Sequence, residues 1–170
     1  MLLVYGSDEA VFHCRSTDAG AIFTKPQEAF RVSNMSLGMR RGPRISVAGK
    51  AVVVMVVRGQ QGKGRDGDVL AWRSADDGAT WQANVWVYRS PDGNVCECCH
   101  PSIMVSDDAV HVMFRNSLAG NRDMYVATSK DDGKTFVPAK KVGQGSWKLN
   151  ACPMDGGMLA AGPKGSLVTV

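Results

Sequence analysis

The segment Ser74-Ala75-Asp76-Asp77-Gly78-Ala79-Thr80-Trp81 occurs a second time as Ser129-Lys130-Asp131-Asp132-Gly133-Lys134-Thr135-Phe136. A third, more divergent copy is Ser16-Thr17-Asp18-Ala19-Gly20-Ala21-Ile22-Phe23, in which Ile22 replaces the threonine of the other two. The three copies begin 58 and 55 residues apart. A repeat at a nearly fixed period indicates a fold built from similar units, each of which buries its apolar face on the next.

Each copy has the composition of a tight turn between two β-strands. The aspartate carboxylate can accept backbone N–H groups across the turn, and glycine readily adopts a positive φ. We expect the closing aromatic side chain to anchor the turn by packing on the neighbouring unit. The structural residues of these turns are then Asp18, Gly20, Asp76, Gly78, Trp81, Asp131, Gly133 and Phe136.

The repeated segment resembles the Asp-box, or bacterial neuraminidase repeat, of the sialidase superfamily. In that family the box forms the turn between the third and fourth strands of a β-propeller blade. The resemblance implies an all-β, sialidase-like propeller. It says less about chemistry, because Asp-boxes also occur in propellers that are not enzymes.

The composition is that of an ordinary globular domain of 170 residues, with 44% hydrophobic and 21% charged residues. The net charge is +4, and the lysines and arginines are scattered instead of forming an aromatic-interleaved stripe. The longest apolar run, Ala51 to Val57, is too short to cross a bilayer. We therefore expect neither nucleic acid nor a membrane as a partner.

The first residues, Met1 to Glu9, lack the basic and long apolar regions of a signal peptide and look like a β-strand. A cytoplasmic location is the expectation on this ground. Export is the alternative if the chain is a fragment of a longer protein.

Short apolar stretches separated by turn residues divide the chain, taken as one domain of residues 1–170, into blades. We assign blade 1 to about residues 1–38, blade 2 to about 42–90, blade 3 to about 99–145, and the start of a further blade to about 152–170. The predicted strands of blade 2 are Arg44 to Val47, Ala51 to Arg58, Asp68 to Ser74 and Gln82 to Tyr88.

Blade 3 is predicted to repeat this order. Its expected strands are Ser102 to Val105, Ala109 to Arg115, Asp123 to Ser129 and Val137 to Val142, with a loop over Asn116 to Arg122. Blade 1 starts at its second strand, with strands at Met1 to Tyr5 and Ala10 to Arg15. The last blade has only two, at Met154 to Ala161 and Ser166 to Val170.

About three blades cannot close a ring, since a closed propeller needs at least about four and sialidase-like propellers have six. One explanation is a homodimer in which two chains together make six blades. The other is that the chain is a fragment. Half a propeller would leave apolar blade faces and strand edges uncovered, which favours the homodimer.

The turns opposite the Asp-boxes carry the unusual residues of the sequence. These are the connections between blades and between second and third strands, and in the sialidase superfamily they hold the active site. Trp147 precedes one of them and could stack on a sugar. The candidate ligand-binding residues there are Arg44, Arg65, His100, Arg122 and Asp155.

Sialidases clamp a carboxylate with three arginines, and they use a tyrosine activated by a glutamate together with an aspartate acid/base. Arg44, Arg65 and Arg122 have suitable positions for the clamp, because arginine recognises a carboxylate through two hydrogen bonds. The tyrosines and glutamates do not form a pair on this face; they are Tyr5, Tyr88, Tyr125, Glu9, Glu28 and Glu97. We therefore expect a glycan-binding or interaction module without sialidase activity and assign no catalytic residue. The alternative is a glycoside hydrolase of the superfamily whose site is completed by a second subunit, with Asp66, Asp123 and Asp155 as available carboxylates.

Cysteines form a second unusual set, in Cys96-Glu97-Cys98-Cys99-His100 and in Cys152-Pro153. This set resembles a subgroup of bacterial sialidase-like propellers with Cys-Glu-Cys-Cys before one blade and Cys-Pro before the next. Three states are open: a disulfide from Cys152 to Cys98 or Cys99, a soft-metal site that includes His100, and buried free thiols. The spacing differs from that of zinc knuckles, so we expect the disulfide and assign no metal or other cofactor.

Overall fold

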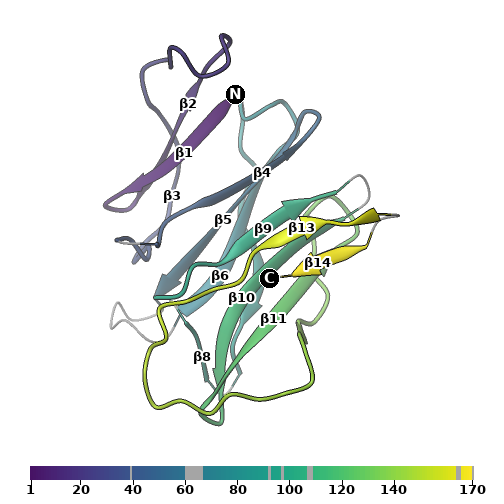
Figure 1. Ribbon diagram of the computed structural model, residues 1–170. Helices are drawn as coiled ribbons and strands as arrows, with labels where there is room; N and C mark the ends of the chain where they lie inside the picture. Colours follow the sequence, from purple (N-terminus) through teal and green to yellow (C-terminus); the bar gives the residue numbers. More distant parts are fainter. Residues whose placement is uncertain are drawn as a thin grey trace.

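The computed structural model describes residues 1–38, 40–59, 67–91, 93–96, 98–106, 109–163 and 166–169. These residues form β-strands and turns, without an α-helix. Among them, no helix is long and apolar enough to cross a lipid bilayer. The strands form antiparallel units that follow one another in chain order, from the purple N-terminal sheet to the yellow C-terminal hairpin (Figure 1).

Two of these units are complete four-stranded blades. Blade 2 contains β4 (Arg44–Ala48), β5 (Ala51–Gly59), β6 (Gly67–Ser74) and β7 (Val85–Arg89). Blade 3 contains β9 (Ser102–Val105), β10 (Val110–Leu118), β11 (Asn121–Ser129) and β12 (Lys140–Lys141). The blade 3 strands Ser102 to Val105 and Asp123 to Ser129 were predicted within two residues of these bounds.

The terminal units have fewer strands. Blade 1 is a three-stranded sheet of β1 (Leu2–Ser7), β2 (Ala10–Arg15) and β3 (Gln27–Arg31). The last unit is a hairpin of β13 (Leu159–Ala161) and β14 (Leu167–Thr169). A short strand that the sequence did not indicate, β8 (Gly93–Val95), pairs with both β6 and β10 and so joins blades 2 and 3 into one nine-stranded sheet.

The predicted loop over Asn116 to Arg122 is wrong. The strands β10 and β11 continue through it and pair up to Leu118 and Asn121, leaving Ala119 and Gly120 as a two-residue turn. Both turn residues have positive φ values, 51° and 81°, which matches the twist of the flanking strands. The polar side chains of this segment concealed the strand pattern. They belong to residues that pair between β10 and β11 close to the turn.

Strand β5 is the centre of the packing, because it is buried on both faces. Its side chains alternate, as they must on a strand. Val52, Val54 and Val56 belong to a core shared with blade 1, whereas Val53, Met55 and Val57 belong to a core shared with blade 3. The hydrophobic cores therefore lie between neighbouring blades, as expected for repeated units that bury their apolar faces on one another.

The first strands of successive units lie side by side along the inner edge of the blades (Figure 1). Two equivalent hydrogen bonds connect them. The Val105 N–H of β9 donates to the Ser46 hydroxyl of β4 at 2.9 Å, and the Leu159 N–H of β13 donates to the Ser102 hydroxyl of β9 at 3.0 Å. These two bonds connect the first strands of neighbouring blades in the same way at their inner edge.

In blades 2 and 3 the Asp-box turn connects the third strand to the fourth, as the resemblance implied, and in blade 1 the first box connects β2 to β3. In the second box, the Ser74 hydroxyl donates to Asp76 Oδ1 at 2.6 Å and accepts the Gly78 N–H at 2.7 Å. Asp76 also accepts the backbone N–H and the hydroxyl of Thr80, at 2.9 and 2.6 Å. The third box repeats these four bonds. The Ser129 hydroxyl donates to Asp131 Oδ1 at 2.6 Å and accepts the Gly133 N–H at 2.8 Å. Asp131 accepts the backbone N–H and the hydroxyl of Thr135 at 2.9 and 2.6 Å.

The first box is weaker for two reasons. Ile22 has no hydroxyl to donate, so Asp18 keeps only the Ile22 N–H at 3.0 Å and the Ser16 hydroxyl at 2.6 Å. The residue before the glycine also has a positive φ in every box, 56° at Ala19 and 60° at Asp77. Alanine tolerates this conformation less well than aspartate does. Each box thus has two consecutive residues with positive φ, of which the glycine is the second.

Loss of the box aspartates should lower the stability of the fold in proportion to the bonds that they accept. Asp76→Ala and Asp131→Ala should each lower the melting temperature by several degrees, because backbone donors of the turn lose a charged acceptor. Asp18→Ala should lower it less. Thermal unfolding followed by circular dichroism measures the difference, and equal melting temperatures for the wild type and all three variants would contradict a structural role.

The same bonds make the stability depend on acid. Hydrogen bonds from Ser74 and Thr80, and the matching ones from Ser129 and Thr135, hold the pKa values of Asp76 and Asp131 well below the ordinary 3.8. Their stabilisation is therefore fully present above the unfolded-state pKa and is lost as the pH falls below it toward the folded-state pKa. The unfolding free energy of the wild type should drop more steeply below about pH 4 than that of Asp131→Asn. Parallel profiles for the two proteins in denaturant titrations would refute this.

Candidate functional site

The end of the blades opposite the Asp-boxes, called here the channel face, is crossed by the segment of residues 142–158, called here the strap. The strap leads from β12 to β13 past the ends of β10 and β11 (Figure 1). Backbone and side-chain bonds attach it to blade 3 and to the connection between blades 1 and 2. The Arg122 N–H donates to the Trp147 carbonyl at 2.6 Å, and Arg40 Nη1 donates to the Met154 carbonyl at 3.1 Å.

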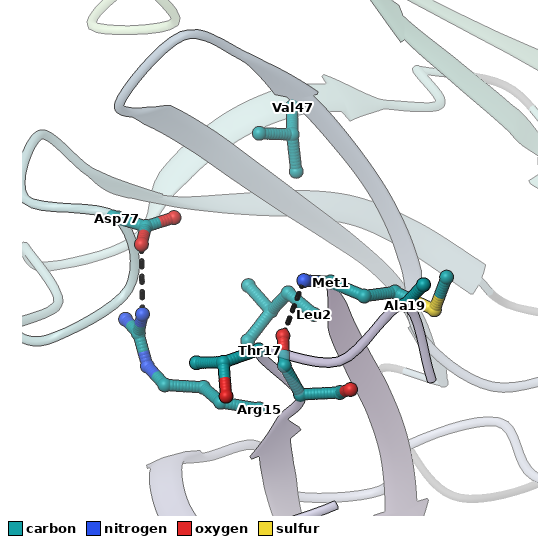
Figure 2. A pocket seen from close by; sticks show the side chains of 8 residues that line it. Met1, Leu2, Arg15, Thr17, Ala19, Val47 and Asp77 are labelled. Atoms are coloured by element: carbon teal, nitrogen blue, oxygen red, sulfur yellow. Dashed lines mark hydrogen bonds and ion pairs between the residues drawn. The ribbon is translucent and has the colours of Figure 1, made fainter. Parts of the chain in front are cut away.

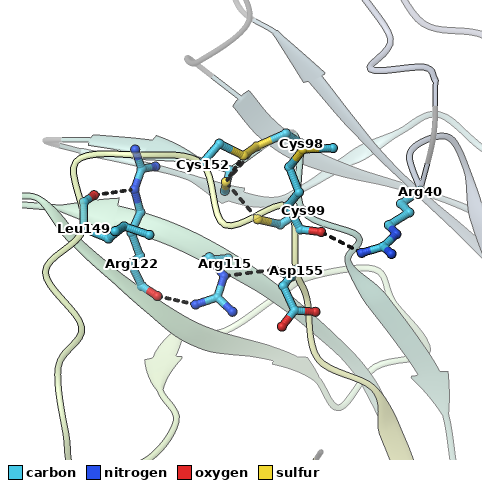
Figure 3. The surroundings of a disulfide bond; sticks show 10 residues. Arg40, Cys98, Cys99, Arg115, Arg122, Leu149, Cys152 and Asp155 are labelled. Atoms are coloured by element: carbon cyan, nitrogen blue, oxygen red, sulfur yellow. Dashed lines mark hydrogen bonds between the residues drawn. A yellow bond between two sulfur atoms is a disulfide. The ribbon is translucent and has the colours of Figure 1, made fainter.

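Arg115 holds the strap against blade 3. Its side chain is buried at the end of the predicted second strand, with a residue exposure of 9%. Nε donates to the Asp155 carbonyl at 3.0 Å, and Nη1 donates to the Arg122 carbonyl (Figure 3). The guanidinium also lies 5.4 Å from the centre of the Trp147 ring, a cation–π distance. Its donors are directed at the protein itself, so Arg115 positions its neighbours.

Arg122 differs from Arg115 because its outer end is open. Nε donates to the Leu149 carbonyl at 3.3 Å, and the side chain is half-buried. Within the described residues its two terminal amino groups make no hydrogen bond, whereas Nε is bound to the strap (Figure 3). A guanidinium held at Nε and open at its other edge can bind a carboxylate through a pair of hydrogen bonds.

Asp123, the neighbour of Arg122, orders the strap. It accepts the Trp147 N–H at 2.9 Å and the Ser146 hydroxyl at 3.0 Å, and Lys141 Nζ lies 3.3 Å from it. Burial on its own would raise the pKa of Asp123, but these donors outweigh it and hold the pKa below its ordinary value. A carboxylate that stays ionised and is fully bonded serves poorly as a general acid.

The cysteines of the two segments meet at this place. Cys98 and Cys152 form a disulfide, one of the two pairings that the sequence left open. Cys96 and Cys99 are buried free thiols, with their sulfurs 3.0 Å apart, and Cys96 Sγ lies 3.3 Å from Cys98 Sγ and 3.9 Å from Cys152 Sγ (Figure 3). We call these four residues the cysteine cluster. Cys14 is a buried free thiol on β2.

The two free thiols of the cluster have opposite acidities. A hydrogen bond from Cys99, assisted by the positive charges of Arg122 and Arg115, lowers the pKa of Cys96 to about 6. The same hydrogen bond to Cys96, together with burial, raises the pKa of Cys99 strongly. One thiolate is therefore favoured at neutral pH, next to the disulfide and two arginines.

Arg44 and His100 lie apart from the cluster, around a cavity of about 240 Å³ between β4 and β9. Arg44 Nη2 donates to the Arg40 carbonyl at 2.9 Å, which connects it to the residue that holds the strap at Met154. The strap packs closely against the backbone of His100, because a Cβ added to Gly156 would lie 1.9 Å from the His100 carbonyl oxygen.

The structure thus brings Arg122 and the backbone of Asp155 into one site, whereas the exposed Asp155 carboxylate faces solvent. It places Arg44 and His100 at a neighbouring cavity. Arg65 lies outside the described residues, as do Asp66 and Glu97. Sequence reasoning did not select Arg40 or Arg115 as candidate site residues. Arg115 could have been found as the last residue of the predicted strand Ala109 to Arg115, where a side chain must reach the channel face.

A second hollow, of about 580 Å³, lies on the opposite face between the first and second Asp-boxes (Figure 2). Its charged groups are largely bonded within the protein. Arg15 Nη1 donates to Asp77 at 2.8 Å, and the Met1 amino group donates to the Ser16 carbonyl at 2.7 Å. This hollow is a seam between two structural turns.

A tyrosine–glutamate pair does not occur on the channel face in the described part of the chain. The Tyr88 hydroxyl accepts the Asn116 amide at 2.8 Å, and burial, with Asp123 and Tyr88 nearby, raises the pKa of Tyr125. Glu28 pairs with Arg31 on blade 1, far along the chain from the cluster. The phenols are therefore structural or poorly disposed to ionise.

A search of curated proteins finds no match to the chain. Solved structures with a similar fold include a protein of unknown function from Dyadobacter fermentans, at 18% identity and a TM-score of 0.66, over 97% of this chain and 46% of that one. An α-L-arabinanase from Penicillium chrysogenum matches at 11% identity and a TM-score of 0.63, over 99% and 52%. A mutant of the NanB sialidase from Streptococcus pneumoniae matches at 12% and 0.57, over 99% and 25%.

The chain thus spans about half the length of the first and second of these proteins and a quarter of the third. At such identities the likeness concerns the fold. The profile of the BNR repeat-like domain matches residues 4–164, which is nearly the whole chain. The chain therefore belongs to the BNR repeat-like domain family, and its fold is that of a sialidase-like β-propeller.

Proposed function

We propose that this chain binds an acidic glycan on the channel face and does not hydrolyse sialosides. The observation that carries the proposal is the open edge of Arg122, whose Nε binds the strap at Leu149 and whose backbone N–H binds it at Trp147. Arg122 offers two parallel donors to a sugar carboxylate. Trp147 is 47% exposed, although Arg115 lies over its ring, and it offers an apolar surface to the C–H groups of the sugar.

The remainder of the site keeps these two groups in place. Arg115 and Asp123 bind the strap on both sides of Trp147, so the indole and the Arg122 guanidinium are held before a ligand arrives. Such preorganisation reduces the entropy lost on binding. Arg44, joined to the strap through Arg40, is the second cation within the described residues that supports an acidic ligand.

We propose that hydrolysis is absent because the tyrosines and Asp123 are poorly suited to be a nucleophile or a general acid. A nucleophilic phenol needs an adjacent base, yet Tyr88 is bonded to an amide and the pKa of Tyr125 is raised. A two-carboxylate mechanism needs carboxyl groups separated by about 5–10 Å. Asp155 is exposed and available, but Asp123 is committed to the strap.

The alternative is a glycoside hydrolase whose second catalytic group comes from other blades. The exposed Asp155 carboxylate favours it, as does the similarity to an arabinanase and to a sialidase. Release of fluorophore from a sialoside or an arabinofuranoside, abolished by Asp155→Asn and retained by Asp132→Asn at an exposed position of the third Asp-box, would replace the binding proposal with this one.

Binding should depend on the fork of Arg122 and not only on its charge. Arg122→Ala should weaken binding of sialyllactose by about 1.5–3 kcal/mol, the range for a hydrogen bond to a charged group. Arg122→Lys should recover only part of the loss, since lysine cannot form the bidentate pair. Isothermal titration calorimetry measures both, with unsialylated lactose as the reference ligand.

Arg31→Ala is the matched control, because Arg31 is exposed on blade 1 and pairs with Glu28. It should bind like the wild type. Equal affinity of Arg122→Ala and the wild type, or equal affinity for sialyllactose and lactose, would overturn the proposal. A melting temperature for each variant separates loss of a contact from loss of the fold.

We further propose that a second copy of the chain supplies the remaining blades of the ring. The outer face of β1 supports this, because Leu3 and Tyr5 are 43% and 37% exposed there and Phe12 stacks on Tyr5 at 5.5 Å. These are the positions at which blade 2 buries its valines. Additional sequence in a longer protein could cover the same face.

Light scattering should report about twice 18.2 kDa for the chain. The double variant Leu3→Lys/Tyr5→Lys should dissociate it, since two charges would face an apolar interface. Val137→Lys, at a 51% exposed position in the Asp-box region of blade 3, is the control and should stay dimeric. A stable monomer of the wild type at micromolar concentration would contradict the dimer.

A further inference from the structure

We propose that the reduced cysteine cluster is a tetrahedral Zn²⁺ site, and that the Cys98–Cys152 disulfide is its oxidised, metal-free form. The cluster gathers four of the five cysteines of the chain. Their sulfurs all lie within 4.8 Å of one another. The proposal concerns thiolate chemistry and does not depend on glycan binding.

The spacing of the sulfurs is close to what the ion needs. Zinc–thiolate bonds of about 2.3 Å in a tetrahedron place the sulfurs about 3.8 Å apart. Cys96 Sγ lies 3.0, 3.3 and 3.9 Å from the other three sulfurs. Shifts of less than about 1 Å around Cys96, with separation of the disulfide sulfurs, would produce the coordination shell.

The backbone already presents the ligands from two directions. Three cysteines come from one turn, closed by the Cys99 N–H donating to the Cys96 carbonyl at 3.2 Å. The Cys96 N–H donates in turn to the Arg115 carbonyl at 2.8 Å, which fixes the turn to β10. Cys152 approaches from the strap. The four thiols thus converge although the cysteines lack the two-residue spacing of zinc knuckles.

The charge of the site is balanced by its surroundings. Four thiolates and one Zn²⁺ carry a net charge of −2, which burial would penalise. Arg115 and Arg122 both act on the Cys96 sulfur through their positive charge. The two positive guanidinium groups thus offset the net charge of −2, and their hydrogen bonds to the strap hold them near the cluster.

His100 is not one of the ligands in this arrangement, which departs from the metal site considered from the sequence. It lines the cavity beside β4, and the group of converging ligand atoms found in the described part of the chain consists of the four cysteines. The chemistry is therefore that of a Cys₄ site, which favours Zn²⁺ among divalent ions.

A reductant can reach the disulfide, and the electrons and protons of its reduction can be accounted for. Cys98 and Cys152 are half-buried, whereas Cys96 and Cys99 are buried, so the disulfide is the side that a reductant reaches. A dithiol reductant transfers two electrons and two protons, giving two cysteine thiols and its own disulfide. Binding of Zn²⁺ then releases the protons that remain on the four thiols. Oxidation of Cys98 and Cys152 by a disulfide oxidant reverses the sequence and expels the ion.

The test is a metal titration of the full chain in two redox states. Protein reduced with a phosphine and freed of metal should bind one Co²⁺ per chain, with the thiolate-to-cobalt charge-transfer and intense visible bands of a tetrahedral thiolate site. Zn²⁺ should displace the Co²⁺ and raise the melting temperature. Protein left in the disulfide form should show neither effect.

The variants separate the cluster from other thiols. Cys152→Ser should weaken Zn²⁺ binding by more than about tenfold, since loss of a ligand should exceed the loss of an outer partner. Cys14→Ser removes a buried thiol outside the cluster and should bind like the wild type, as should His100→Ala. If Cys152→Ser does not fold, Cys98→Ser serves in its place.

Three results would overturn the proposal. The first is reduced wild-type protein that retains no Zn²⁺ after dialysis. The second is equal Zn²⁺ affinity in the Cys14→Ser and Cys152→Ser variants. The third is equal binding by the reduced and the disulfide form. Loss of the cobalt bands in His100→Ala would assign the site to histidine and likewise reject a Cys₄ shell.

Discussion

The rest of the structure depends on β5 being buried on both faces. An antiparallel strand in water usually has one dry face, whereas the valines of β5 alternate between a core with blade 1 and a core with blade 3. Neither core exists without the neighbouring blade. The blades therefore stabilise one another in a row, and an end blade keeps an open face until something covers it, as Leu3 and Tyr5 of β1 illustrate.

This arrangement separates structural work from chemistry at the two ends of the blades. The Asp-boxes close one end by local bonds, and their aromatic residues reach back into the preceding interface: Trp81 packs with the core that blade 2 shares with blade 1, and Phe136 with the core that it shares with blade 3. The strap at the other end lacks such a core. It is held by Arg40, Arg115, Asp123 and a disulfide, which are polar or covalent devices.

The fold could be predicted because its signals are local and repeated. The box residues have one geometry wherever they occur, and the apolar run of β5 is evident in the sequence. The site could be predicted only in outline. Arg122 was proposed from its place between two predicted strands, but the hairpin between β10 and β11 and the bridging strand β8 depend on pairing with distant residues. Arg115 looked like an ordinary strand end, because its partners are backbone carbonyls of the strap, 40 residues away at Asp155.

The cysteine cluster lies where the strap needs a covalent or metal link. Cys152 is 54 residues from Cys98, so the link closes a long loop around blade 3, and a cross-link over a long loop restricts the unfolded chain most. A zinc ion held by the same sulfurs would close the same loop. The two states differ in charge beside Arg122: the disulfide form carries no more than the single negative charge of Cys96, whereas a zinc tetrathiolate carries a net charge of −2 and would occupy the positive field that otherwise attracts a carboxylate. If both proposals hold, oxidation of the cluster would strengthen acidic-ligand binding at Arg122, and reduction with Zn²⁺ present would weaken it. The shared arginine is the physical connection between them.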